Sequence, residues 1–195
     1  MSASATYPAV ELDGSVHQLI GDTEDLAVLG APADEPAFKS AMGLLASGVV
    51  MVTTWHEGRP WGLTISSCCS LTLRPQQILI SLRSATVSCR QALSSGRFGV
   101  SILGADQKEV AEFGAAPGQA KFIDELCADA VPPAGPAIPG ALRHLDCAVA
   151  DDHPVGDHTI IVGRVLQITG PPAGDADAAP LLYYDRAFRR IGGAI

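Results

Sequence analysis

A run of small hydroxyl and thiol residues interrupts the apolar pattern of the chain at positions 62–72. Its sequence is Gly-Leu-Thr-Ile-Ser-Ser-Cys-Cys-Ser-Leu-Thr, in which eight of eleven residues are Gly, Ser, Thr or Cys. Side chains this small let backbone N–H groups approach a flat or phosphorylated ligand closely, and their hydroxyls add hydrogen-bond partners. The run predicts a ligand-binding strand; a polar, half-exposed strand with serines facing water is the alternative.

A second candidate binding segment is Ser-Leu-Arg-Ser-Ala-Thr at 81–86, where an expected strand ends and an expected helix begins. Helix N-termini bind anions through their unpaired N–H groups and the helix dipole. Arg83, Ser84 and Thr86 would add side-chain contacts to a phosphate. The alternative is that Ser84 or Thr86 only caps the helix, which is the commoner role of such residues.

A third candidate is the stretch Asp-Asp-His-Pro-Val-Gly-Asp-His-Thr at 151–159, directly before an expected strand. Residues 151–153 are expected in a solvated hairpin turn. His158 differs, because an imidazole at the start of a strand can point into a cleft and hydrogen-bond a substrate, with its other nitrogen held by Asp157. Histidine beside carboxylates also suits a metal ion, but the sequence offers no second ligand cluster, so we expect no metal site.

The motifs of several other chemistries are absent from the sequence. There is no G-x-G-x-x-G after a strand, no Gly-Lys-Ser/Thr phosphate loop and no G-x-S-x-G nucleophile elbow. The zinc signatures H-E-x-x-H and paired C-x-x-C are also missing. The three candidate segments therefore carry the functional interpretation.

Periodicity and turn residues predict the elements that position these segments. A helix is expected after Pro36, with Asp34 and Glu35 at its start, and Asp106 followed by Glu109 has the form of a second capping box. The other expected elements are strands at 49–54, 78–82, 98–103, 145–150 and 159–169, extended chain at 61–73 and a helix at 86–93. Short strands separated by turns predict a mainly β fold, an antiparallel barrel or sandwich with small helices attached.

The composition describes a folded chain with an acidic beginning. Of 195 residues, 47% are hydrophobic and 17% are charged, so the chain can bury the core of one domain. The net charge is −8, and residues 1–35 carry seven carboxylates and no Lys or Arg. We expect an acidic, mobile tail at 1–33 and one folded domain at 34–195. Without basic clusters, nucleic acid is not an expected partner.

Cysteine spacing and hydropathy bear on the compartment. The five cysteines include the adjacent Cys68 and Cys69 and show no C-x-x-C spacing, which favours free thiols in a reducing compartment. No apolar run approaches the roughly 18 residues of a membrane span, and the first residues lack the pattern of a signal peptide. We expect a cytoplasmic protein that does not bind membranes.

Six short motifs occur in order along residues 36–190. They are Ala-Ser-Gly-Val-Val-Met-Val-Thr-Thr at 46–54, Gly-Leu-Thr-Ile-Ser-Ser at 62–67, Leu-Arg-Pro at 73–75, Ser-Ile-Leu-Gly-Ala-Asp-Gln at 101–107, Gly-Asp-His at 156–158 with Gly-Arg-Val at 163–165, and Pro-Leu-Leu-Tyr-Tyr at 180–184. Together they resemble the flavin reductase-like family, the short-chain NAD(P)H:flavin oxidoreductases that serve two-component monooxygenases. The acidic tail lies outside this resemblance.

The resemblance implies a Greek-key split β-barrel of the FMN-binding type, forming a homodimer with two flavin sites near the subunit interface. Its activity would be hydride transfer from NADH or NADPH, with NADH preferred, to FAD or FMN, with FAD slightly preferred. The reduced flavin would pass to a partner flavin-dependent monooxygenase. A flavin-binding module without turnover and a protein-interaction domain on the same barrel are the alternatives, which flavin-dependent NADH oxidation separates from the enzyme.

The resemblance also implies which residues form the site. The flavin ring and ribityl chain would contact Thr64, Ile65, Ser66, Ser67, Ser81, Leu82 and Arg83. The phosphate or adenine side would be reached by Ser84, Thr86, Lys121 and Phe122, and the set is completed by Tyr184 and Arg189. His158 matches the family's histidine near the nicotinamide, where we expect it to orient the carboxamide without transferring a proton.

Overall fold

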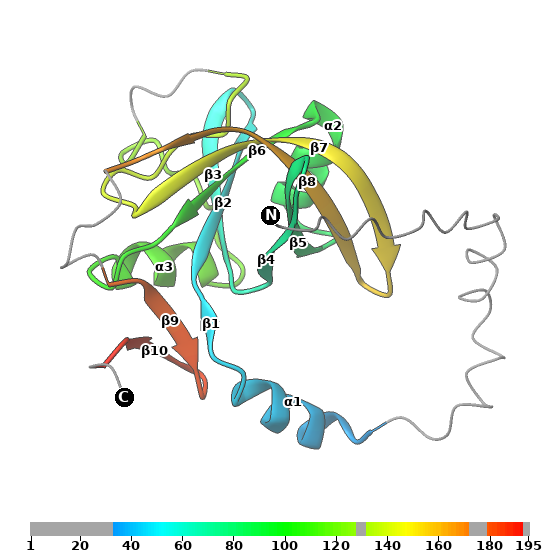
Figure 1. The fold of residues 1–195 in the computed structure, drawn as a ribbon, viewed down its shortest axis with the longest axis vertical. Helices are drawn as coiled ribbons and strands as arrows, with labels where there is room; N and C mark the ends of the chain where they lie inside the picture. Colours follow the sequence, from blue (N-terminus) through cyan, green and yellow to red (C-terminus); the bar gives the residue numbers. More distant parts are fainter. Residues whose placement is uncertain (1–32, 128–131, 172–178, 193–195) are drawn as a thin grey trace, which may run out of the picture. The chain divides into compact units, whose positions relative to one another are not determined.

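The computed structural model describes residues 33–127, 132–171 and 179–192 (Figure 1). The chain divides into two units, residues 1–41 and 42–195. Helix α1 (Glu35–Gly43) begins in the first unit after Asp34, whose Oδ2 accepts a hydrogen bond from Ala37 N at 3.2 Å. The expected helix is confirmed, whereas the tail expected at 1–33 lies, except for its last residue, outside the described residues.

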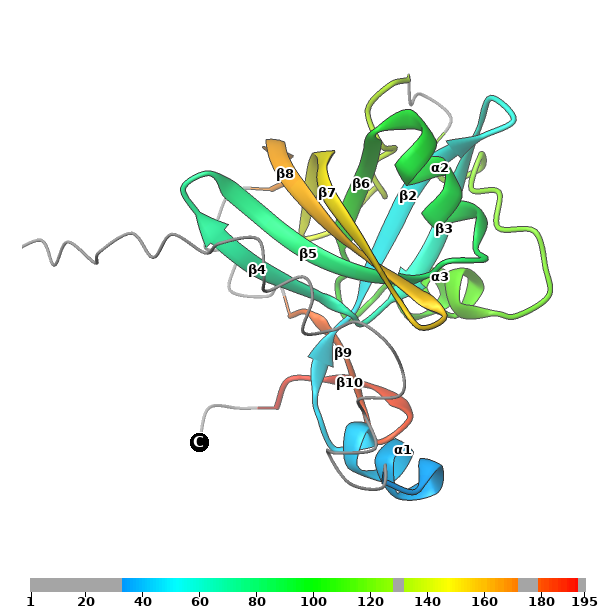
Figure 2. The ribbon, with the colours of Figure 1, turned by 90° about the vertical axis from the view of Figure 1, so that its right-hand side faces the viewer.

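Two antiparallel sheets organise the second unit. The larger has seven strands in the order β3-β2-β6-β7-β8-β5-β4, and in the smaller sheet β9 lies between β1 and β10. The strands are β1 (Ser47–Gly48), β2 (Val50–His56), β3 (Arg59–Ile65), β4 (Cys68–Leu73), β5 (Gln76–Arg83), β6 (Arg97–Ile102), β7 (Arg143–Val155), β8 (His158–Thr169), β9 (Leu181–Tyr184) and β10 (Ala187–Arg190). The larger sheet curves around an apolar interior without closing (Figure 2), so the expected mainly β, split-barrel fold is confirmed.

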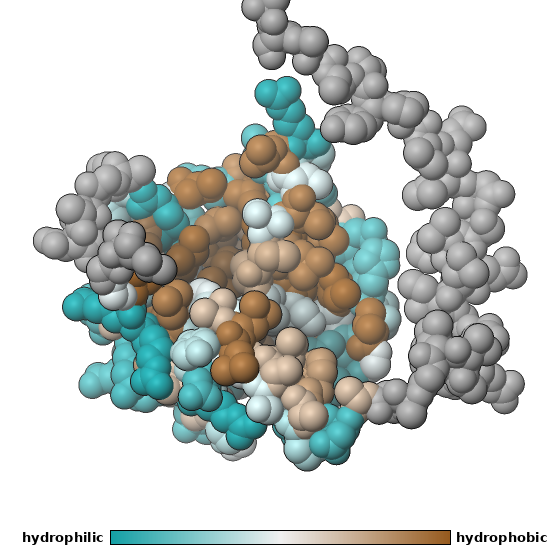
Figure 3. All heavy atoms as spheres, turned by 60° about the horizontal axis from the view of Figure 1, so that its bottom comes forward, coloured by the Kyte–Doolittle hydropathy of each residue, from teal (hydrophilic) through white to brown (hydrophobic). Residues whose placement is uncertain are grey.

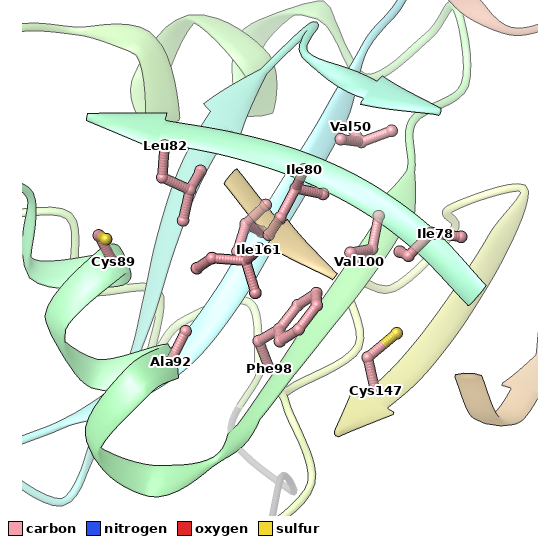
Figure 4. Packing of buried hydrophobic residues seen from close by; sticks show 11 residues of the cluster. Val50, Ile78, Ile80, Leu82, Cys89, Ala92, Phe98, Val100, Cys147 and Ile161 are labelled. Carbon is pink, nitrogen blue, oxygen red and sulfur yellow. The ribbon is translucent and has the colours of Figure 1, made fainter. Parts of the chain in front are cut away.

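Strand β2 has buried side chains on both of its faces, which explains the unbroken apolar run of the sequence. Val50 and Val52 belong to the core inside the barrel, together with Ile80 and Phe98 (Figure 4). Met51, whose side chain points to the other face, belongs to a second core outside the barrel. Helix α3 (Lys108–Ala115) covers that second core through Ala111.

Helices α2 and α3 begin in different ways: α2 has a side-chain N-cap and α3 does not. Helix α2 (Val87–Ser95) has Thr86 as its N-cap and ends at Gly96, whose positive φ of 69° suits glycine. Cys89 and Ala92 of α2 pack into the barrel core. The capping box expected at Asp106 is wrong, because α3 begins at Lys108 and its N-cap is Gln107.

Gln107 makes no side-chain cap; its amide instead bonds to neighbouring loops. Its Oε1 accepts a hydrogen bond from Gly104 N at 3.0 Å, and its Nε2 donates to Pro139 O at 2.8 Å. A buried amide that satisfies two backbone groups is worth more here than a cap on an exposed first turn.

The hairpin of β7 and β8 is longer than expected. Residues 151–153 were expected in a turn, but they continue β7 and pair with residues 160–162 of β8, so that prediction is wrong. Their side chains are exposed, and the β-branched partner strand carries the pairing further than the polar sequence of β7 suggests. The turn lies instead at Gly156 and Asp157, where Gly156 has a φ of 59°.

Three further features concern chemistry and compartment. All five cysteines are free thiols. Among the described residues, no group of three or more His, Cys, Asp or Glu side chains is arranged to hold a metal ion. In the same part of the chain, no helix has the length and apolar character needed to cross a membrane.

Candidate functional site

The hydroxyl-rich segment lies where the two edges of the larger sheet meet. β3 and β4 are the edge strands of that sheet, yet they are consecutive in the chain and only Ser66 and Ser67 separate them. The segment 64–67 therefore bridges the split of the barrel. Thr64 and Ile65 are half-buried, whereas Ser66 and Ser67 are exposed, so this bridge offers hydroxyls and backbone groups to a ligand.

A cavity of about 750 Å³ opens beside this segment. One wall is formed by Thr64, Ile65 and Ser66, and the others come from α3 and from the hairpin of β9 and β10. The remaining lining residues are Val49, Lys108, Glu112, Ala115, Ala116, Tyr183, Arg186, Ala187, Phe188 and Arg189. Its volume falls in the range of sites that hold drug-sized molecules and cofactors.

Thr64 gives this cavity an unsatisfied polar group. Its Oγ1 is buried and has no hydrogen-bond partner among the described residues. Helix α3 approaches closely at Gly114: a Cβ there would meet Met51 Cε at 2.7 Å and Thr64 N at 2.9 Å. The absence of a side chain at Gly114 therefore lets α3 pack directly over Thr64 and form the cavity wall, with the unpaired hydroxyl covered by the helix.

Of the residues predicted from sequence, four line this cavity: Thr64, Ile65, Ser66 and Arg189. Tyr184 does not, because alternate residues of β9 face opposite sides and Tyr183 occupies the lining position. Tyr183 packs on Phe188 of the neighbouring strand with ring centroids 5.5 Å apart. The Tyr-Tyr pair in the sequence indicated this wall, but it did not predict which of the two rings faces the cavity.

Ser67 connects the cavity segment to β5. Its backbone oxygen accepts a hydrogen bond from Ser81 N at 3.0 Å, and its Oγ donates to Ser81 O at 2.7 Å. These bonds extend the pairing of β4 and β5 by one residue beyond Cys68 and Ile80. Ser67 and Ser81, which the resemblance placed in one site, are thus brought together.

A cluster of polar residues lies where the end of β5 meets the start of β8. Ser84 N donates to Asp157 O at 2.9 Å, and Ser84 Oγ lies 2.9 Å from Thr159 Oγ1. Arg83 Nε lies 3.7 Å from Asp157 Oδ2. The structure therefore places Arg83, Ser84 and the Asp157 turn side by side, although none of them lines the 750 Å³ cavity.

His158 lies at the edge of this cluster of polar residues. Its Nδ1 lies 2.6 Å from Asp157 Oδ1, which confirms the expected contact, and its side chain is 42% exposed. The hydrogen bond with His158, followed by the nearby charges of His158 and Arg83, holds the pKa of Asp157 below its usual range. Asp157 is therefore an ionised acceptor that fixes the ring, leaving Nε2 free of this contact.

Two residues of this region have structural roles that limit what they offer a ligand. Thr86 Oγ1 accepts from Cys89 N at 3.3 Å and donates to Arg83 O at 2.7 Å, so Thr86 is the N-cap of α2. Leu82 is 1% exposed and belongs to the barrel core. Only the backbone of Leu82 could contact a ligand, because successive side chains of β5 alternate between core and surface.

Lys121 and Phe122 are not among the residues that line the 750 Å³ cavity. Lys121 is 9% exposed, its Nζ donates to Ala116 O at the end of α3, and burial lowers its pKa. Phe122 packs edge-on against Trp61 and lies beneath the guanidinium of Arg59, which is 3.8 Å from the ring centroid. Both residues anchor the loop after α3 against β3.

The chain is similar to known proteins over most of its length. Residues 42–192 match the family model described as flavin reductase like domain. The reductase component of a 4-nitrophenol 4-monooxygenase/4-nitrocatechol 2-monooxygenase from Rhodococcus opacus is 36% identical over 157 residues, covering 80% of this chain and 81% of that protein. An NADH-dependent flavin reductase from a Rhodococcus species is 34% identical, covering 78% and 84%.

A solved structure resembles the fold described above. It is the NADH:FAD oxidoreductase SgcE6 of Streptomyces globisporus C-1027 in complex with NAD and FAD fragments, which is 30% identical to this chain. The superposition has a TM-score of 0.70 and covers 83% of this chain and 98% of that one.

Proposed function

The chain belongs to the flavin reductase like family, and we propose on that premise that the 750 Å³ cavity and the split of the barrel take a flavin and NADH together. The protein is an oxidoreductase that reduces flavin with NADH and supplies the reduced flavin to a partner monooxygenase. The observation that carries the assignment of the site is the position of residues 64–67, which bridge the split and line the cavity.

The residues present fit a flavin. The cavity is large enough for a cofactor-sized molecule, and the cationic side chains of Lys108, Arg186 and Arg189 line it beside the hydroxyl-bearing segment 64–67. When bound, the flavin and the nicotinamide themselves supply the redox chemistry, since a hydride passes between their rings. The protein's work is to hold the two rings in contact and to stabilise the arriving negative charge.

In our proposal, the segment 64–67 stabilises the negative charge that arrives on the flavin. Its hydroxyls and backbone N–H groups lie on a bridge whose far end is fixed by Ser67 and Ser81. Donors held this way need no rearrangement when charge develops on a neighbouring ring, and that preorganisation is the source of their effect. Arg83 and Ser84 extend the same polar surface toward β8.

His158 positions the nicotinamide and so helps to hold the two rings in contact. Because Asp157 occupies Nδ1, Nε2 is the atom that meets the carboxamide, and no proton needs to move. Replacing His158 with Ala should lower kcat/KM for NADH without abolishing turnover. An unchanged KM and kcat in His158→Ala would remove this role.

The decisive experiment for the function is steady-state oxidation of NADH with and without added FAD or FMN. Flavin-dependent oxidation is the expected result. Bound flavin without turnover would favour a flavin-binding module, and neither property would favour an interaction domain. We propose FAD over FMN and NADH over NADPH, supported by the name and ligands of the Streptomyces relative, and the same assay ranks all four substrates.

We further propose that the protein is a homodimer. Large apolar side chains of the second unit are exposed, among them Leu71, Leu73, Val155, Leu166 and Ile168. One face of the molecule shows a broad apolar area (Figure 3), and a second copy would remove such surface from water. Light scattering on a size-exclusion column should give twice the chain mass; the mass of one chain would contradict the proposal.

Two proposals concern location and the acidic N-terminal residues. The five free thiols and the use of NADH support a cytoplasmic location. Residues 1–33 lie before the family match, so we propose that they aid solubility and not turnover. Removing them should leave kcat/KM unchanged, whereas loss of activity in a folded truncated protein would contradict this.

A further inference from the structure

Two cavities lie on either side of α3 and differ in charge. The 750 Å³ cavity is lined by three cationic side chains, those of Lys108, Arg186 and Arg189, and by one carboxylate, that of Glu112, for a net charge of +2. The other cavity, of about 540 Å³, is lined by Arg59 and by three carboxylates, for a net charge of −2; these are Glu109, Asp124 and Glu125. In a chain with a net charge of −8, the positive cavity is the one that suits an anion.

The positive charge of this cavity is concentrated on two arginines. Lys108 Nζ lies 3.2 Å from Glu112 Oε1, so these two charges offset one another. Arg186 and Arg189 form no ion pair with any described carboxylate. Their planar guanidinium groups are suited to two parallel hydrogen bonds with a phosphate.

The backbone of Arg186 gives an independent reason to look for a ligand. Tyr184 and Ala187 pair across the hairpin, which leaves Asp185 and Arg186 as a two-residue turn with φ values of 47° and 59°. Turns with two positive φ values favour Asn-Gly or Asp-Gly, because an L side chain is disfavoured in the left-handed region. An arginine at the glycine position is therefore explained by its side chain and not by the turn.

We propose that Arg186, supported by Arg189, binds the phosphate groups of a dinucleotide in the 750 Å³ cavity and determines the preference for phosphorylated over phosphate-free substrate. This rests on the proposed function for the site but adds a specificity residue to it. The phosphate could belong to the flavin or to the nicotinamide nucleotide. Both have the same chemistry, and the experiment separates them.

The test measures binding by calorimetry and turnover by NADH oxidation, with FAD, FMN and riboflavin as flavins and with NADH and reduced nicotinamide mononucleotide as donors. The variants are Arg186→Gln and Arg186→Gly. The glycine variant relieves the left-handed turn, so a loss of binding there does not come from misfolding. Arg190→Gln is the matched control, since Arg190 is an exposed cation at the end of β10, the strand that follows the turn, and does not line the cavity.

Both Arg186 variants should weaken binding of the phosphate-bearing partner about tenfold, as expected for loss of a charge-assisted hydrogen bond. A loss confined to FAD and FMN, with riboflavin unchanged, assigns the flavin phosphate. A loss for NADH that exceeds the loss for the mononucleotide assigns the second phosphate of the donor. Equal losses for riboflavin and FAD with both donors unchanged would overturn the proposal, as would an equal effect of Arg190→Gln.

The outcomes also separate this inference from the proposed function. If the wild-type protein binds FAD but oxidises no NADH, the reductase assignment fails, while the calorimetric comparison of FAD with riboflavin still decides the role of Arg186. If turnover is present and Arg186→Gln behaves as wild type with every substrate, the function stands and the phosphate site is wrong.

Discussion

Ser67 and Ser81 hydrogen-bond to each other on the β4 side of the split of the barrel. Ser81 N donates to Ser67 O at 3.0 Å and Ser67 Oγ donates to Ser81 O at 2.7 Å, so one serine binds both backbone groups of the other. Since Ser67 ends the bridge between the two edge strands, this pair connects the cavity segment to β5 and, through β5, to the His158 turn.

Replacing Ser67 with Ala removes the side-chain bond and keeps the backbone bond. Because the group is exposed, the free energy of unfolding should fall by less than ~1 kcal/mol. The KM for flavin should rise about threefold, since the bridge is held less firmly. Ser70→Ala is the control: Ser70 is exposed on β4 and its hydroxyl makes no hydrogen bond to the described residues. Equal KM values for Ser67→Ala and wild type would show that the pair is structural only.

Gly114→Ala should damage both stability and activity. The new Cβ would lie 2.7 Å from Met51 Cε and 2.9 Å from Thr64 N, and it would also meet Thr64 Oγ1. Overpacking of this kind costs about 1–3 kcal/mol and would push α3 away from the segment that lines the cavity.

The control for this substitution is Gly48→Ala, because a Cβ at Gly48 meets nothing within 4 Å. Chemical denaturation and the KM for flavin are the measurements. Gly48→Ala should behave as wild type in both. If Gly114→Ala also kept the wild-type KM, the position of α3 would not matter for the site.

Local patterns were sufficient for most strands of the larger sheet and for the segment that bridges its split. An unbroken β-branched run marked β2, and the hydroxyl run marked the segment that bridges the split, because both are properties of consecutive residues. The contact of His158 with Asp157 was predictable for the same reason. The burial of Leu82 could also have been predicted, because Leu82 lies between Ser81 and Arg83 on an alternating strand. The resemblance had instead assigned all three residues to the ligand.

The rest of the cavity depends on contacts between distant parts of the chain. Arg186 and Phe188 reach the site because β9 pairs with β1 beside the start of β2, and no local pattern specifies that pairing. Lys121 shows the opposite case: a cation in a matching motif suggested a phosphate contact, yet folding buries it against Ala116 at the end of α3. Side-chain direction in a loop is set by packing, which a single sequence does not display.

Asp157→Ala should reduce kcat/KM for NADH more than it changes the KM for flavin. The carboxylate fixes His158 through Nδ1 and faces Arg83, and its loss frees the ring to rotate. Because the pair is exposed, the effect should be at most about fivefold. Asp152→Ala removes an exposed carboxylate from β7 and serves as the control. A wild-type kcat/KM for Asp157→Ala would show that His158 needs no such support.

His144 should make folding stability depend on pH. It is 7% exposed, lies 2.9 Å from Ser101 Oγ through Nδ1, and burial lowers its pKa in spite of the backbone of Gly135 and the charge of Asp146. In the unfolded chain the ring takes up a proton near pH 6.5, whereas in the folded protein it does so only at lower pH. The unfolded state therefore binds more protons in between, and stability falls as the pH drops from 6.5 toward the folded pKa.

The measurement is Tm across the range from about pH 7.5 to about pH 5.5, which spans the ordinary pKa of histidine. Wild type should lose stability toward acid, and His144→Gln, whatever its stability at neutral pH, should lose less over the same interval. His153→Gln is the matched control, because its side chain is 48% exposed on β7. It should retain the wild-type slope, since this variant leaves the buried ring of His144 in place. If His144→Gln kept that slope as well, the buried ring would not be the group that senses pH.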